Sequence, residues 1–168
     1  PAWLRSPSSY ANVTEATLRC VPVAAGLVLI LLTGFLGRGL GWASVPAALL
    51  VAASPAFVFY SRYYIQEMLL VCFTFGALVS GYRYAKSARK RWAIAAGAFV
   101  GLMHATKETC IIALAAMLLG VAFIVLGRLG RGWPFRSAVG AVKGRHLVWG
   151  LATAVIVSAA FYSGFFRH

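Results

Sequence analysis

Six long apolar runs, separated by short polar or basic segments, dominate this sequence. Each run approaches the roughly 20 residues that a helix needs to cross a bilayer. The chain of 168 residues is 61% hydrophobic and only 11% charged, whereas soluble domains are about 25% charged. The sequence therefore predicts an all-α, polytopic membrane helix bundle over residues 15–168, with about six transmembrane helices. We expect these spans near residues 17–36, 42–60, 62–84, 92–106, 108–126 and 147–165.

Both ends of the chain indicate a longer protein. The sequence opens at Pro1 without an initiator methionine and stops just after an apolar run. We therefore expect a fragment truncated at both ends, with residues 1–14 as the remnant of an outer loop.

The net charge of +13 would favour a nucleic-acid partner in a soluble protein. In a membrane protein the positive-inside rule explains it better. Six alternating spans put 11 basic residues on one side and five on the other. We therefore expect a multi-pass protein of the cell membrane, with the basic loops cytoplasmic, membrane lipids as partners and no nucleic acid. Binding of anionic lipid by these loops is a secondary possibility. The 11 residues are Arg38, Arg83, Lys86, Arg89, Lys90, Arg91, Arg128, Arg131, Arg136, Lys143 and Arg145.

Two short polar segments on the other side are the candidate functional site, because charge this close to hydrocarbon is costly and is usually functional. Arg62 and Lys107 suit a phosphate, and both are expected near helix N-termini, which also favour anions. Glu67 is expected about five residues into the third helix, with Tyr63 and Tyr64 on its face. With Arg19 and Glu108, these residues are expected to converge on one outward-facing pocket.

A structural explanation of the same residues stays open. Arg62 and Lys107 could extend to lipid headgroups, with Glu67 and Glu108 paired to them between helices. His104 is interpreted as a packing residue, and no metal is predicted because no Asp-x-Asp motif occurs.

Two further patterns predict helix geometry. The residue before a proline avoids the α region, so Ser54-Pro55 predicts a kink or break shortly before Arg62. Gly97 and Gly101 form a GxxxG pattern, which predicts a face for close helix packing.

Three phrases of the sequence together resemble a known superfamily. They are Glu15-Ala16-Thr17-Leu18-Arg19-Cys20-Val21-Pro22, the stretch from Ser54-Pro55 through Ser61-Arg62-Tyr63-Tyr64-Ile65-Gln66-Glu67, and Ala105-Thr106-Lys107-Glu108-Thr109. The set is similar to GT-C polytopic glycosyltransferases, the class of the dolichyl-phosphate-mannose protein mannosyltransferases and the aminoarabinose transferase of lipid A. Within that class it most resembles the prokaryotic flippase-activity-associated family of archaeal N-glycosylation.

The resemblance implies an enzyme that transfers a sugar from a polyprenyl-phosphate donor to an acceptor at the non-cytoplasmic face, with no further cofactor. It implies that Arg62, Lys107 and Arg19 lie near the donor phosphate, and that Glu67, Glu108 and the two tyrosines orient the sugar or the bases. The resemblance does not indicate whether the acceptor is a protein, a glycan or a lipid.

One departure from the superfamily concerns the catalytic residue. GT-C enzymes carry an acidic motif, typically Asp-Glu, in the first outer loop, and this chain has no Asp and no acid in residues 1–14. We expect that acid upstream of Pro1, where it would act as base in an inverting displacement, and we expect the fragment alone to be inactive.

The rival hypothesis is a non-catalytic transporter, lipid-flipping subunit or assembly subunit. Transporters place polar groups near the midplane and often contain internal repeats. Here the polar groups gather at one face and no repeat is visible, which favours the transferase.

The predicted topology has a direct test. In a background without native cysteines, a cysteine at Ser87 or Ser137 should react with an impermeant maleimide only from the cytoplasmic side. Labelling of either position in intact cells would mean that the basic loops lie outside the cell, the reverse of the predicted topology.

Overall fold

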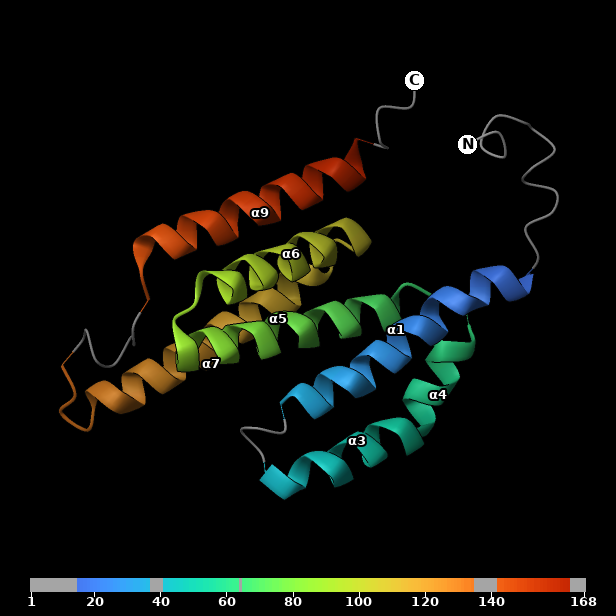
Figure 1. The fold of residues 1–168 in the computed structure, drawn as a ribbon, viewed down its shortest axis with the longest axis horizontal. Coiled ribbons are helices and arrows are strands. Elements are labelled where there is room, and N and C mark those ends of the chain that lie inside the picture. The colour runs from blue at the N-terminus through green and yellow to red at the C-terminus, as the bar shows by residue number, and fades with distance from the viewer. Residues whose placement is uncertain (1–14, 37–40, 64, 135–141, 164–168) are drawn as a thin grey trace. The chain divides into compact units, whose positions relative to one another are not determined.

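The fold is described from a computed structural model, which covers residues 15–36, 41–63, 65–134 and 142–163. Helices dominate these ranges and no strand occurs within them (Figure 1). The all-α membrane bundle predicted from the sequence is confirmed. The chain divides into two compact units, Pro1–Cys72 and Phe73–His168, which we describe separately.

The first unit is built around α1 (Glu15–Phe35), which packs against α3 (Ser44–Ala53) and α4 (Pro55–Arg62). A short 3-10 helix, η3 (Gly41–Ala43), precedes α3. Pro22 lies inside α1 and its side chain is fully buried. Leu29 and Thr33 are also buried on this helix, and the Thr33 hydroxyl donates to the Leu29 carbonyl at 2.9 Å. The buried hydroxyl is therefore satisfied within its own helix, and no partner helix has to supply an acceptor.

The predicted break at Ser54-Pro55 is confirmed. Ser54 has φ −63° and ψ 120°, an extended conformation, and α4 begins at Pro55. The two helical segments on either side are bent by 53°. Proline both pushes the preceding residue out of the α region and fits the first position of a helix.

The second unit contains the greater part of α5 (Glu67–Ser87), with α6 (Lys90–Thr106), α7 (Cys110–Leu129) and α9 (Gly144–Tyr162). Its main contact is between α6 and α9, which run parallel (Figure 1). A Cβ added to Gly97 would collide with the Gly150 carbonyl, and one added to Gly101 would lie 2.6 Å from the Ala154 carbonyl oxygen. The close-packing face predicted from GxxxG is confirmed, since only a residue without a side chain allows this approach.

Among the described residues, α5, α7 and α9 are long and apolar enough to cross a membrane. The bent pair formed by η3–α3 and α4 would be a fourth span if it crosses as one. The apolar part of α1, Leu18–Gly34, and the 17-residue α6 are shorter. A helix of 17 residues still covers about 25 Å, so the count of six spans stays a prediction.

The predicted start of the third span at residue 62 is wrong. Arg62 is the last residue of α4, and α5 starts at Glu67. Tyr63, the residue after Arg62, is extended, with φ −96° and ψ 140°, so α4 ends there and does not continue into α5. The other predicted bounds differ from those of the helices by no more than about three residues.

The tight α6–α9 contact gives a matched pair of glycine substitutions. Alanine at Gly97 should destabilise the fold by about 1–3 kcal/mol through overpacking. Alanine at Gly120, where an added Cβ meets no atom within 4 Å, should stabilise it by up to about 1 kcal/mol through helix propensity. Thermal unfolding of the purified protein measures both. Equal shifts for the two variants would contradict the close approach.

Candidate functional site

The connection between α4 and α5 carries the first pair of predicted site residues. Arg62 ends α4 and is exposed, while Glu67 begins α5 and is half-buried. Tyr63 has left the helix, with φ −96° and ψ 140°, and its carbonyl accepts a hydrogen bond from the Ile65 N–H at 2.8 Å. The Gln66 carbonyl accepts from Leu70 N–H at 3.0 Å, which is the first bond of α5.

This geometry corrects three sequence expectations. Arg62 is in the last turn of a helix, not near an N-terminus, and Glu67 is the first residue of its helix, not five residues into it. Tyr63 does not share a helical face with Glu67, because it precedes the helix; its ring packs on Phe59, with centroids 4.6 Å apart. Tyr64 lies outside the described residues.

The observed placement is electrostatically favourable for both charges. The C-terminal end of a helix carries partial negative charge and the N-terminal end partial positive charge. Arg62 lies at the first kind of end and Glu67 at the second. Each arrangement is worth about 0.3–1 kcal/mol at the surface. The charges of Arg62 and Glu67 therefore each lie at the helix end that favours them.

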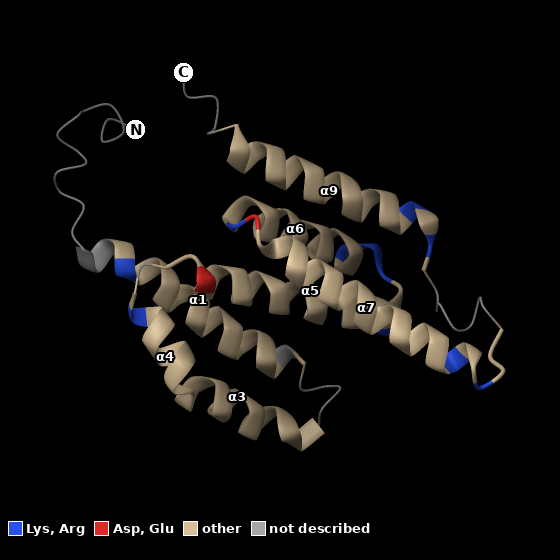
Figure 2. Ribbon diagram, turned by 180° about the vertical axis from the view of Figure 1, so that it is seen from behind, with Lys and Arg blue, Asp and Glu red and all other residues tan. Residues whose placement is uncertain are grey.

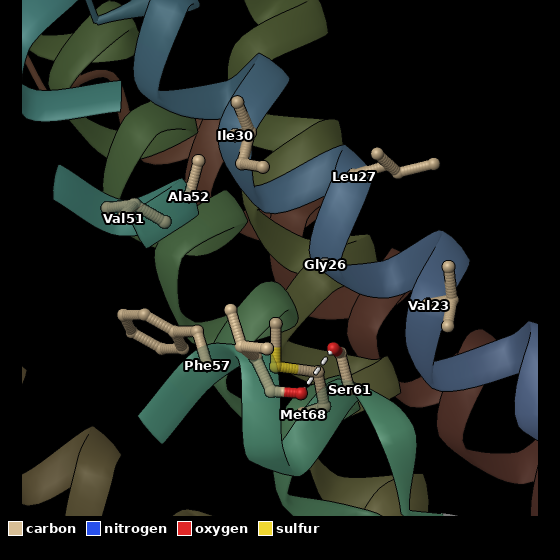
Figure 3. A pocket seen from close by; sticks show the side chains of 10 residues that line it. Val23, Gly26, Leu27, Ile30, Val51, Ala52, Phe57, Ser61 and Met68 are labelled. Atoms are coloured by element: carbon tan, nitrogen blue, oxygen red, sulfur yellow. Dashed lines mark hydrogen bonds between the residues drawn. The ribbon is translucent and has the colours of Figure 1, made fainter. Parts of the chain in front are cut away.

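Burial of Met68 fixes where α5 begins. Its side chain is 2% exposed, and a Cβ on Gly26 of α1 would lie 3.2 Å from the Met68 Cε. Both residues line a cavity of about 130 Å³ between α1, α3, α4 and the start of α5 (Figure 3). The lining is almost wholly apolar; its one side-chain hydroxyl, Ser61, is bonded to the Val58 carbonyl at 2.9 Å. This cavity therefore suits hydrocarbon better than a sugar or a phosphate.

Arg19 lies on α1, one turn before Val23, which lines that cavity. Residues four apart share a helical face, so Arg19 occupies the same side of α1 toward the helix start. Its side chain is exposed and takes part in an interaction within the protein. The side chain of Glu15, four residues earlier, is outside the described part of the chain.

The second pair of predicted site residues belongs to the other unit. Lys107 follows α6 in an extended conformation, with φ −160° and ψ 137°, and is half-buried. Glu108 and Thr109 are exposed, and α7 begins at Cys110. Met103 and Cys110, both 0% exposed, bracket this connection. Two buried residues thus hold a three-residue polar turn at the end of α6.

His104 has a partner that the sequence did not reveal. Its Nδ1 lies 2.7 Å from the Ser158 Oγ, and its ring centroid is 5.3 Å from that of Tyr162. The three side chains line a cavity of about 500 Å³ between α6, α7 and α9, which is otherwise apolar. Ser158 is 54 residues away in sequence, so no local spacing could have indicated it.

Within the described residues, no group of three His, Cys, Asp or Glu side chains is placed to hold a metal ion. Cys72 and Cys110 are buried and Cys20 is exposed, all three as free thiols.

The described residues define a class of protein: an apolar helical bundle in which the ionisable residues of the predicted site lie at helix ends. The family model for dolichyl-phosphate-mannose-protein mannosyltransferase matches residues 2–162, and the chain belongs to this family. Membership implies a membrane glycosyltransferase that uses a polyprenyl-phosphate sugar donor. No curated protein and no solved structure matches the chain.

The His104–Ser158 contact can be measured by a double-mutant cycle. Alanine at both positions should show a coupling of about 0.5–1.5 kcal/mol in the free energy of unfolding, the usual net value of a hydrogen bond. Pairing His104→Ala with Thr153→Ala is the control, because the Thr153 hydroxyl bonds only to Trp149 O in its own helix at 2.7 Å. A coupling near zero in the first cycle would mean that the hydrogen bond is not formed.

Proposed function

We propose that this protein is a GT-C-type glycosyltransferase of the kind found in archaeal N-glycosylation, in the flippase-activity-associated family. It transfers a sugar from a polyprenyl phosphate to an acceptor at the non-cytoplasmic face of the membrane. The observation that carries the proposal is the family match over residues 2–162.

The direction of α6 and α9 supports the proposed orientation of the protein in the membrane. Because α6 and α9 run parallel, their first residues lie at one end of the second unit and their last residues at the other. Basic residues gather at the first end (Figure 2). Lys107 and Glu108 follow α6 at the second end. The positive-inside rule then favours the first end as cytoplasmic, which directs Lys107 outward.

Arg62 and Lys107 bind the donor phosphate in this proposal. The guanidinium of Arg62 is exposed and offers a planar fork to two phosphate oxygens, and Lys107 offers a point charge. As the sugar leaves, negative charge develops on the phosphate, and cations already in place stabilise it without reorganisation. Arg19 adds a third positive charge.

Glu67 and Glu108 orient the sugar or the basic side chains. Glu67 follows Arg62 by five positions and Glu108 follows Lys107 by one, each in a polar connection between helices. Tyr63, 48% exposed beside Arg62, presents a ring face and a hydroxyl to the sugar, and Tyr64 is assigned the same role from the sequence alone.

Single substitutions at the two cations test the proposal. In the full-length protein, Arg62→Ala and Lys107→Ala should each lower sugar transfer by about 10²–10³-fold, the usual cost of removing one donor to a developing anion. Transfer from a radiolabelled polyprenyl-phosphate sugar, measured in membranes at matched protein levels, gives the rates.

Arg131→Ala and Lys86→Ala are matched controls, since both remove the same charges from exposed positions and should leave transfer unchanged. Sugar transfer at the wild-type rate in both Arg62→Ala and Lys107→Ala would contradict the phosphate-binding role. Absence of transfer by the full-length wild type, with lipid-linked sugar nevertheless moved across the membrane, would favour a transporter or flipping subunit.

A further inference from the structure

A second cavity lies at the basic end of the second unit, away from the Lys107 connection. It measures about 230 Å³ and is lined by residues of α5, α6 and α9, including Tyr84, Ala96, Gly97, His146 and Gly150. Pockets that hold a whole small ligand usually measure about 300–1,000 Å³. The cavity therefore fits one part of a larger molecule, and its lining is almost wholly apolar.

One hydrogen-bonded chain lies in its wall. The Lys143 N–H donates to the Tyr84 hydroxyl oxygen at 3.2 Å, and the same hydroxyl is hydrogen-bonded to Nδ1 of His146, 3.3 Å away. His146 is 7% exposed. These two hydrogen bonds connect the end of α5 to the start of α9, so they hold this wall of the cavity in place.

Three exposed cations lie at this end of α6 and α9, close to residues of the wall. Lys90 places its Nζ 3.8 Å from the centroid of the Trp149 ring, next to Gly150. Lys143 and Arg145 flank the start of α9, beside His146. The second unit contains one acid, Glu108, which follows the far end of α6, roughly 25 Å away along a helix of this length. No carboxylate of this unit neutralises these cations.

We propose that this end of the second unit binds one phospholipid with an anionic head group. A segment of acyl chain occupies the apolar cavity, and Lys90, Lys143 and Arg145 hold the head group. The charges support this assignment. The one carboxylate of this unit, Glu108, lies at the far end of α6, so it does not neutralise the three cations beside the apolar cavity. Each Lys or Arg near an anionic lipid surface adds favourable energy. The site is separate from the donor site and does not rest on the proposed activity.

Native mass spectrometry of the purified protein, exchanged into an equimolar mixture of phosphatidylglycerol and phosphatidylcholine, tests this. The wild type should retain one phosphatidylglycerol in preference to phosphatidylcholine. Lys143→Gln combined with Arg145→Gln should weaken that retention by about 20-fold. Both side chains are exposed, so the variant should fold, and its elution profile checks this.

Arg128→Gln combined with Arg131→Gln is the matched control, because it removes the same charge at the end of α7, outside the cavity. It should leave retention within twofold. Equal losses in both double variants would mean diffuse attraction and would overturn the site.

Ala96→Phe tests the cavity itself, since it fills the space and changes no charge. It should weaken retention of phosphatidylglycerol as strongly as the charge variant. Unchanged retention, or displacement of the lipid by inorganic phosphate, would overturn the acyl-chain half of the proposal.

A dimer in the wild type that Ala96→Phe dissociates would assign the cavity to a second copy, and preferential binding of polyprenyl phosphate would assign it to the donor; either would overturn the proposal.

Discussion

The close approach of α6 and α9 determines the organisation of the second unit. Gly97 lies against the Gly150 carbonyl and Gly101 against Ala154, so the two backbones meet where any larger residue would separate them. The two helices run parallel, so the chain returns through α7 from the end of α6 before α9 begins. The ends of the unit then differ in chemistry: Lys90, Lys143 and Arg145 at one, His104 and Lys107 at the other.

The first unit depends on a different constraint, the interruption of helical structure on either side of α4. Ser54-Pro55 starts the short helix and Tyr63 ends it, and burial of Met68 against Gly26 sets where α5 begins. Arg62 and Glu67 consequently lie at two helix ends that suit their charges. Polar groups are thus kept at connections, where a membrane protein can tolerate them.

Much of this organisation could be predicted from the sequence. Apolar run lengths indicated the helices, Ser54-Pro55 the break, and Gly97 with Gly101 the packing face, because each is a local signal with a local cause. The break after Arg62 could not be predicted, since Tyr63 to Gln66 contain neither glycine nor proline and the cause is tertiary. The His104–Ser158 and Tyr84–His146 contacts join residues 54 and 62 positions apart, which no spacing rule reaches.

Photo-crosslinking of the donor tests the central claim most directly. A polyprenyl phosphate carrying a photoreactive group beside the phosphate would be irradiated with the purified protein, and labelled peptides would be identified by mass spectrometry. The account predicts labels in the peptides that contain Arg62 or Lys107, competed by unlabelled polyprenyl phosphate. Labelling confined to the α9 start around Lys143 and Arg145, or no competed label, would contradict it.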